Sequence, residues 1–187
     1  MNELPSRDEA LGLLHEYTQG AGLRKHAYAV ECAMRAHARR LGEPEEAFGL
    51  VGLLHDFDYE RWPSLDDHPF RGSEILERLG YPEWFRRAIL SHGDHTKVAR
   101  TTGLEKCLFA VDELCGFVTA CTLVLPSKAL ADLKYESVKK RMKDKAFARS
   151  VNRDDIVNGA AAIRMTVEDH IVFVVDAMRA SASALGL

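Results

Sequence analysis

The sequence of 187 residues lacks the features of several large protein classes. Its net charge is −3, whereas proteins that coat nucleic acid are usually basic, so a nucleic-acid partner is not expected. The opening residues, MNELPSRDEA, lack the basic start and apolar run of a secretory signal. The four cysteines form no Cys-x-x-Cys pair, and their helical surroundings predict buried thiols rather than a disulfide framework. Together these absences predict a cytoplasmic protein.

An uninterrupted apolar run of membrane-spanning length is also missing. The nearest approach is CLFAVDELCGFVTACTLVL, residues 107–125, which contains Asp112 and Glu113. An acidic residue in the middle of a span costs about 2.5 kcal/mol or more on insertion scales. We therefore predict that this segment is a buried core helix carrying a functional acid, and we expect no membrane partner.

Strand-like alternation, internal repeats and linkers are absent, while helix signals recur along the whole chain. Four helix starts are indicated by capping residues, namely Ser6 with Glu9, Thr102 with Glu105, Asn152, and Thr166. Another helix is predicted over 23–41, and Pro126 interrupts the long helix that Thr102 begins. The length suits one sizeable core. We predict an all-α fold, a single helical bundle over residues 1–187 in which helices from 127–187 pack on the rest.

Four residues with metal-binding side chains stand at the ends or in the middles of predicted helices. They are His26, His55, Asp56 and Asp112, and the middle pair lies in GLLHDFD, where an apolar helix stops. Imidazoles and carboxylates suit a zinc, manganese or iron ion that keeps open positions for water and substrate. Any one of the four is more readily explained as a hydrogen-bonded core residue. If their helices pack on one another, however, one metal site explains all four.

Three other histidines lack such a pattern. His37 shares a helix face with His26, but eleven residues of helix separate the two by about 16 Å, too far for one ion. His15 and His170 have no nearby metal-binding partners. We predict structural or surface roles for these three.

The order of the four candidate ligands resembles that of the HD-domain superfamily of metal-dependent phosphohydrolases. The matching residues are His26 in LRKHAYAVECA, His55 and Asp56 in GLLHDFD, and Asp112 in LFAVDEL. The resemblance covers residues 23–120. It implies a helical domain that binds a divalent metal ion and hydrolyses a phosphate ester.

Two further histidines extend the resemblance. His68 in HPFRGSEIL and His92 in ILSHGDH match members of the superfamily that bind two metal ions. The six-ligand pattern resembles a branch with a di-iron centre that hydrolyses dinucleoside polyphosphates, and this implies that Asp56 bridges two ions. Some relatives have a second histidine where this chain has Gly93, and the nearby His95 either substitutes for it or lies in a mobile loop. We expect one or two divalent ions per chain.

The phosphate-binding residues are less clear. Many relatives place a lysine where this chain has Tyr59, so the phosphate charge must be met elsewhere. One candidate is Arg71, and another is the segment 134–153, which holds eight basic and two acidic residues. Its candidate substrate-binding residues are Lys139, Lys140 and Lys143, which form either a clamp over an anionic substrate or a solvated helix face.

The expected reaction is hydrolysis of a phosphate ester by metal-activated water. The substrate class would be a nucleotide or another small phosphorylated metabolite. Candidate catalytic residues are Asp56 and Asp112, with Asp58 and His95 as further proton carriers. A di-iron oxygenase with the same ligands and a non-catalytic nucleotide-sensing module are the alternatives. The oligomeric state, a homodimer included, stays open at this point.

Overall fold

The computed structural model describes residues 4–187, which form ten α-helices and two short 3₁₀ helices and no strand. The prediction of an all-α fold is confirmed for this part of the chain. The α-helices are α1 (Arg7–Tyr17), α2 (Ala21–Leu41), α3 (Glu45–Leu54), α4 (Phe70–Arg78), α5 (Glu83–Leu90), α6 (Gly103–Leu123), α7 (Tyr135–Met142), α8 (Arg153–Ala162), α9 (Val167–Arg179) and α10 (Ala182–Leu185). The 3₁₀ helices are η1 (Asp94–Thr96) and η2 (Leu130–Asp132).

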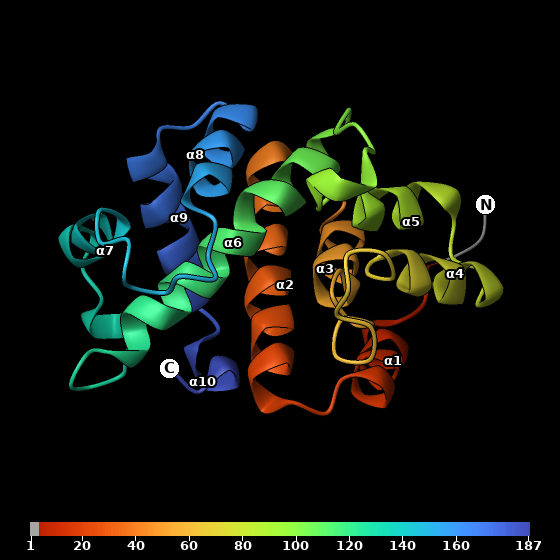
Figure 1. The fold of residues 1–187 in the computed structure, drawn as a ribbon, viewed down its shortest axis with the longest axis horizontal. Coiled ribbons are helices and arrows are strands. Elements are labelled where there is room, and N and C mark those ends of the chain that lie inside the picture. The colour runs from red at the N-terminus through yellow and green to blue at the C-terminus, as the bar shows by residue number, and fades with distance from the viewer. Residues whose placement is uncertain (1–3) are drawn as a thin grey trace.

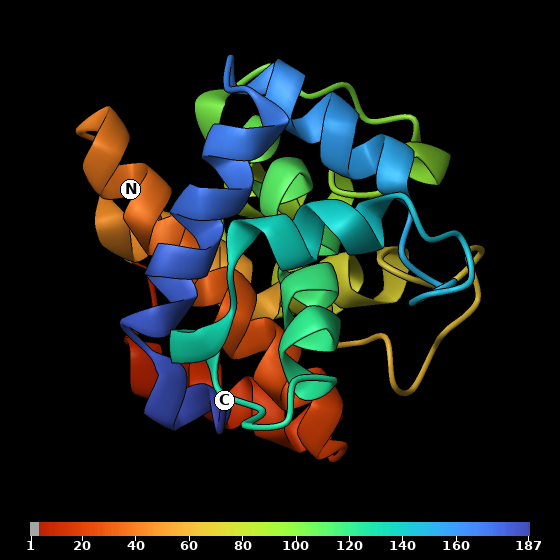
Figure 2. The same cartoon turned by 90° about the vertical axis from the view of Figure 1, so that its left-hand side faces the viewer.

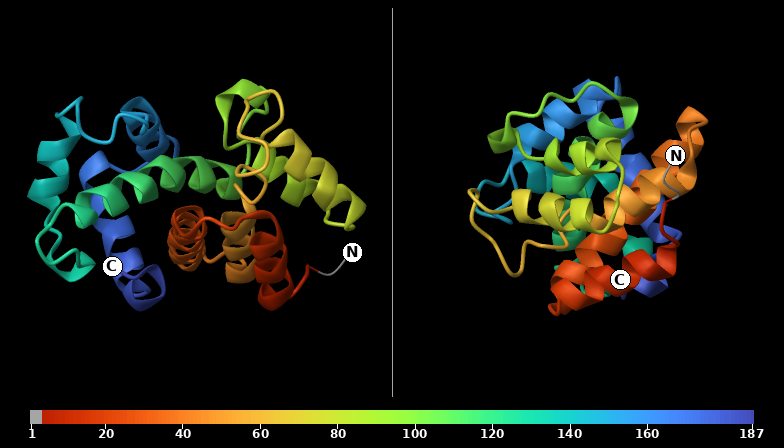
Figure 3. Two further views of the ribbon diagram at one scale, coloured as in Figure 1. Left: turned by 60° about the horizontal axis from the view of Figure 1, so that its bottom comes forward. Right: turned by 90° about the vertical axis from the view of Figure 1, so that its right-hand side faces the viewer.

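Two long helices organise the bundle. Helix α2 stands at the centre, and α6 crosses it on the way from the α7–α9 group toward α5 (Figure 1). Helix α2 packs most extensively against α3, and α6 packs against both α2 and α8. The helices α7, α8 and α9 cover one side of the molecule (Figure 2), and α4 and α5 cover the other (Figure 3). The C-terminal helices therefore pack on the earlier ones.

The helix starts follow from the capping residues. Both predicted capping boxes form, at Ser6 with Glu9 and at Thr102 with Glu105. The side chains of Asn152 and Thr166 cap α8 and α9 as expected. One boundary differs, because α2 begins at Ala21 and so includes Gly22. Helix α6 ends at Leu123, three residues before Pro126.

Twelve of the 21 residues of helix α6 are buried, which explains its membrane-like composition. Its buried residues include Cys107, Cys115 and Cys121, and all four cysteines, with Cys32, are free thiols as predicted. Burial raises the pKa of Cys107 and of Cys121 to about 12, so both stay protonated. No helix within residues 4–187 combines the length and the apolar character needed to cross a membrane.

The contact between α6 and α8 depends on one glycine. A Cβ atom at Gly159 would lie 2.6 Å from the Cα of Ala110, which is backbone and cannot rotate away. The close approach of these two helices matters for the site described below, since α8 begins beside the middle of α6.

We expect Gly159→Ala to destabilise the protein by about 1–3 kcal/mol, because the methyl group overpacks this contact. Chemical denaturation of the two proteins measures the difference. Gly12→Ala in α1 is the matched control, since nothing lies within 4 Å of its Cβ position and alanine there favours the helix by about 0.5–1 kcal/mol. Equal stability of the Gly159→Ala and Gly12→Ala variants would contradict this packing.

Candidate metal centre

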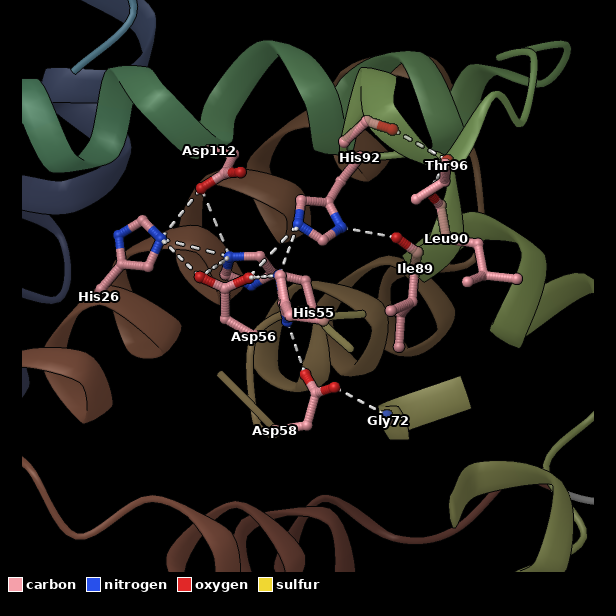
Figure 4. A network of polar contacts seen from close by, with 12 residues as sticks. His26, His55, Asp56, Asp58, Gly72, Ile89, Leu90, His92, Thr96 and Asp112 are labelled. Atoms are coloured by element: carbon pink, nitrogen blue, oxygen red, sulfur yellow. Dashed lines mark hydrogen bonds and ion pairs between the residues drawn. The ribbon is translucent and has the colours of Figure 1, made fainter. Parts of the chain in front are cut away.

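The six predicted metal ligands come from two helices and from the segments beside three others. His26 is in the second turn of α2, and Asp112 is in the middle of α6. His55 is the C-cap residue of α3, with Asp56 directly after it. His68 and His92 lie just before α4 and just after α5, respectively. Side chains from separate parts of the sequence thus point toward one region (Figure 4).

Four of these residues form a first cluster, whose potential ligand atoms all lie within 4.8 Å of one another. The Nε2 atom of His26 is 3.0 Å from Oδ1 of Asp112 and 3.2 Å from Nε2 of His55. The His55 Nε2 atom is 3.4 Å from both Asp112 Oδ1 and Asp56 Oδ2. The structure thus places His26, His55, Asp56 and Asp112 around a common point.

A second cluster shares Asp56 with the first. It consists of Asp56, His68 and His92. The two imidazole Nε2 atoms are 3.3 Å apart, and they lie 3.2 and 3.4 Å from Oδ1 of Asp56. Asp56 therefore turns one oxygen toward each cluster.

Hydrogen bonds at the far side of three imidazoles fix their tautomers. The Nδ1 atoms of His55 and His92 lie 2.8 Å from the Gly52 carbonyl oxygen and 2.6 Å from the Ile89 carbonyl oxygen. Because a carbonyl oxygen only accepts, each Nδ1 donates, and the neutral ring has its lone pair on Nε2. His68 Nδ1 donates in the same way to Oδ1 of Asp58, 2.8 Å away. The free lone pairs therefore point into the clusters.

This arrangement fits a divalent cation. Lone pairs of neutral imidazoles at 3.2 to 3.3 Å repel unless a proton or a metal ion lies between them. Oδ1 of Asp56 is buried and makes no hydrogen bond, an uncommon state for a carboxylate oxygen. Imidazole nitrogens and carboxylate oxygens also form the ligand set expected for zinc, manganese or iron.

Protons and metal cations would compete for the imidazole nitrogens and carboxylate oxygens of the two clusters. Burial lowers the pKa of His68, but its close contacts with the carboxylates of Asp56 and Asp58 outweigh it and raise the value to about 9. Burial is likewise outweighed at His55, whose pKa the negative charges of Asp56 and Asp112 raise well above its usual range. The carboxyl pKa of Asp112 is lowered, since attraction to His55 and the His26 hydrogen bond outweigh its burial. Metal binding would have to displace protons.

A cavity of about 490 Å³ opens onto both clusters. Among the described residues, the lining includes no lysine and no arginine. Tyr59 lines the cavity where many relatives are expected to have a lysine, and its ring packs on His68 at 5.2 Å. Five carboxylates take part in the lining, namely Asp56, Asp94, Asp112, Glu113 and Asp155. The cavity is therefore acidic.

Several lining residues were missed by the sequence analysis, and three of them form a polar group where α6 meets the start of α8. Glu113 follows Asp112 on α6 and accepts a hydrogen bond from the backbone N–H of Asn152 at 3.2 Å. Burial, together with the charge of Asp112, raises the pKa of Glu113 to about 7. The Asn152 side chain donates to Asp155 at 2.8 Å. The sequence showed Asn152 only as a helix cap, and nothing local indicated that α8 begins at the cavity.

The structure corrects the prediction that Asp58 carries protons for the substrate. Asp58 is fully buried and does not line the cavity. Its Oδ1 accepts from His68, and its Oδ2 accepts from the backbone N–H of Gly72 at 2.7 Å. A side chain at Gly72 would clash with this carboxylate, because its Cβ would lie 2.9 Å from Asp58 Cγ. Asp58 orients a ligand of the second cluster.

His95 and Gly93 both line the cavity wall. His95 lies in η1 and lines the cavity, with Nε2 2.8 Å from the carbonyl oxygen of His68. This segment is thus an ordered turn rather than the mobile loop considered from the sequence. A Cβ atom at Gly93 would lie only 2.5 Å from the His95 ring. The glycine therefore makes room for that imidazole.

The predicted phosphate-binding residues do not lie at the cavity. Arg71 is half exposed and pairs with Asp67 and Glu74 at 3.2 and 3.3 Å. Lys140 and Lys143 line a separate pocket beside α7, and Lys139 lies over the ring of Tyr135. This placement contradicts the clamp interpretation, since the lysines of α7 form a solvated surface.

The comparisons with known proteins agree with the site. A family model described as the HD domain matches residues 23–181. The match extends well past residue 120, where the resemblance seen in the sequence ended, and includes the helices from α7 to α9. Neither the search of curated proteins nor the search of solved structures found a match.

We expect Asp58→Ala to weaken metal binding at the second cluster by about 10–100-fold, the usual effect of removing a residue that orients a ligand. Titration of the chelator-treated protein with Mn²⁺ measures the change, and circular dichroism checks the fold. The control is Asp66→Ala, which removes an exposed carboxylate. If both variants bind Mn²⁺ alike, Asp58 does not orient a ligand.

The metal-free protein should lose stability as the pH rises from 6.5 to 9. The folded pKa of His68, about 9, exceeds its ordinary value of 6.5, so the protonated imidazole stabilises the folded state fully below pH 6.5. That stabilisation disappears as the pH passes through the folded pKa. Melting temperatures of chelator-treated protein test this, and saturating Mn²⁺ should reduce the decrease, because the ion replaces the proton. A constant or rising melting temperature without metal would contradict the expectation.

Proposed function

Because the chain belongs to the HD-domain family, we propose that it is a metal-dependent phosphohydrolase whose ligands form the two clusters around Asp56. In this proposal His26, His55, Asp56 and Asp112 hold one divalent ion. Asp56, His68 and His92 hold a second ion, and Asp56 bridges the two. Iron, manganese and zinc all suit this ligand set.

The observation that carries the proposal is the orientation of Asp56. Its two oxygens face different sets of imidazoles, and three of these imidazoles are fixed in the tautomer that offers a lone pair. A structural role for one ion would need only the first cluster. The second cluster, with its own buried orienting carboxylate, supports a two-ion site open to the cavity.

When bound, divalent ions lower the pKa of coordinated water and neutralise charge on a phosphoryl oxygen. The chain itself contributes position and hydrogen bonds. Asp112 and Asp56 lie on the floor of the cavity, where either carboxylate can accept a proton from the attacking water. His95 lines the same cavity and can contact the substrate if its ring leaves the His68 carbonyl.

The cavity lining favours a substrate of low negative charge. No described lysine or arginine lines it, and Glu113 and Asp155 add negative charge at the rim. Two divalent ions carry four positive charges, and the carboxylates of Asp56 and Asp112 offset two of these, so a polyphosphate would bring more negative charge than the site offsets. We therefore favour a small phosphate monoester or diester, with Tyr59 and Phe109 offering aromatic contacts to its organic part.

We expect Mn²⁺-loaded protein to hydrolyse p-nitrophenyl phosphate or bis-p-nitrophenyl phosphate. Asp56→Ala should reduce the rate at least about 100-fold, because it removes a ligand shared by both ions. Release of nitrophenolate measures the rate. Asp66→Ala, an exposed carboxylate, is the matched control and should keep the full rate.

Two results would contradict the proposal. One is hydrolysis that survives unchanged in Asp56→Ala. The other is an absence of hydrolysis together with oxygen consumption by the ferrous protein, which would identify a di-iron oxygenase with the same ligands. An oxygen electrode and the nitrophenolate assay, run on the same preparation, separate these outcomes.

A further inference from the structure

A second pocket lies away from the metal centre, at the far end of the same two long helices. It is formed where the C-terminal ends of α2 and α8 meet the N-terminal end of α6, and its volume is about 390 Å³. Three basic side chains line it, those of Arg40, Lys106 and Arg164. Leu41 and Ile163 give it an apolar part. Its size is within the range of pockets that bind small molecules.

The positive charge of this pocket is not compensated. Within residues 4–187, no acidic side chain lines the pocket, and none forms an ion pair with Arg40, Lys106 or Arg164. Among the described residues, Arg40 contacts two neutral groups, the sulfur of Met165 and the ring of Phe173, whose centroid is 5.7 Å from its guanidinium carbon. Three unpaired cations at one pocket are unusual for a chain of net charge −3.

A buried imidazole faces the pocket without a partner. His37 lines it, is 1 % exposed, and has an Nε2 atom that makes no hydrogen bond. The ring of His170 lies behind it at 5.4 Å, fully buried and with both nitrogens unpaired. Buried polar atoms are nearly always hydrogen-bonded, so unpaired ones indicate a missing partner. Since His37 lines the pocket, a molecule bound there can supply the missing partner of Nε2.

The backbone at Arg164 is a further indication. This residue follows α8 in the left-handed conformation, with φ of 57°. The hydrogen bond from Met165 N to the Ala160 carbonyl closes the helix end as in a Schellman motif, where this position is usually glycine. A side chain is strained there, and such strain is often retained where the residue binds a ligand. Here the strained residue is one of the three basic residues that line the pocket.

We propose that this pocket binds a small phosphorylated molecule with an apolar portion. The two guanidinium groups and the ammonium group match the charge and the oxygen atoms of a phosphate. Leu41 and Ile163 would cover the apolar portion, and His37 Nε2 would gain a hydrogen bond. The proposal does not depend on the proposed function, because none of these residues belongs to the metal centre.

The pocket shares both of its long helices with the metal centre. Helix α2 carries His26 in its second turn and His37 and Arg40 near its end, and α6 carries Lys106 and Asp112. A ligand in the pocket would therefore contact the two helices that position the first metal cluster.

The test uses adenosine monophosphate and inorganic phosphate as probes and the ring signal of His37 as a local reporter. In ¹³C-histidine-labelled protein, His37→Gln identifies that signal. We expect adenosine monophosphate to shift it saturably, and Arg164→Gly to weaken the apparent affinity at least tenfold. Lys128→Gly is the matched control, because Lys128 is also a basic residue in the left-handed conformation but lies outside the pocket.

The variants keep the outcome clear. Arg164→Gly should melt no lower than the wild-type protein, since glycine adopts the left-handed conformation without strain. Inorganic phosphate should shift the same signal with lower affinity than adenosine monophosphate, and equal affinities would overturn the apolar contact. Equal affinities of the Arg164→Gly and Lys128→Gly variants, or shifts confined to other histidine signals, would overturn the site itself.

Discussion

The convergence of imidazole lone pairs on the carboxylate of Asp56 is the interaction on which the rest of the site depends. The Nε2 atoms of His26 and His55 are 3.2 Å apart, and those of His68 and His92 are 3.3 Å apart. Such contacts are unfavourable without a cation or a proton between the nitrogens, so the fold must hold them together by other means. The packing of α2 against α3 and α6 does so for the first cluster. Gly52 permits that packing, since a Cβ there would lie 3.1 Å from the Glu31 backbone.

The side chains of the two clusters are held in place in different ways. The first cluster takes its predicted ligands from the two long helices α2 and α6 and from the end of α3. The second cluster takes His68 and His92 from segments outside the helices, where a side chain needs additional support. Asp58 provides that support for His68 by accepting a hydrogen bond from its Nδ1, and the backbone N–H of Gly72 in turn holds Asp58. Within residues 4–187 the buried Asp58 carboxylate has the His68 ring and the Gly72 backbone N–H as its only hydrogen-bond partners, so its role is to orient His68.

The sequence predicted those features of the fold and the site that depend on local pattern. Capping boxes at Ser6 and Thr102 act within one helical turn, so spacing alone located those helix starts. The order of the four candidate ligands His26, His55, Asp56 and Asp112 could be recognised because each of these residues ends or interrupts an apolar helix face. The sequence could not predict on which side of the molecule the exposed basic residues lie, because charge does not determine which way a helix faces. Lys140 and Lys143 lie on α7, away from the cavity. Asn152 reaches the cavity only because Gly159 lets α8 approach α6.

The charge distribution explains how the metal centre could admit an anion at all. Five carboxylates line the cavity, and within the described residues only Asp94 among them pairs with an arginine or a lysine, Arg100 at 2.6 Å. Without cations the cavity would repel a phosphate ester, so ligand binding there should require metal loading first. The basic pocket at the end of α2 and α6 has the opposite character and needs no metal to attract a phosphate. The same two helices thus carry one site whose affinity for anions depends on bound cations and another whose affinity is built into its side chains.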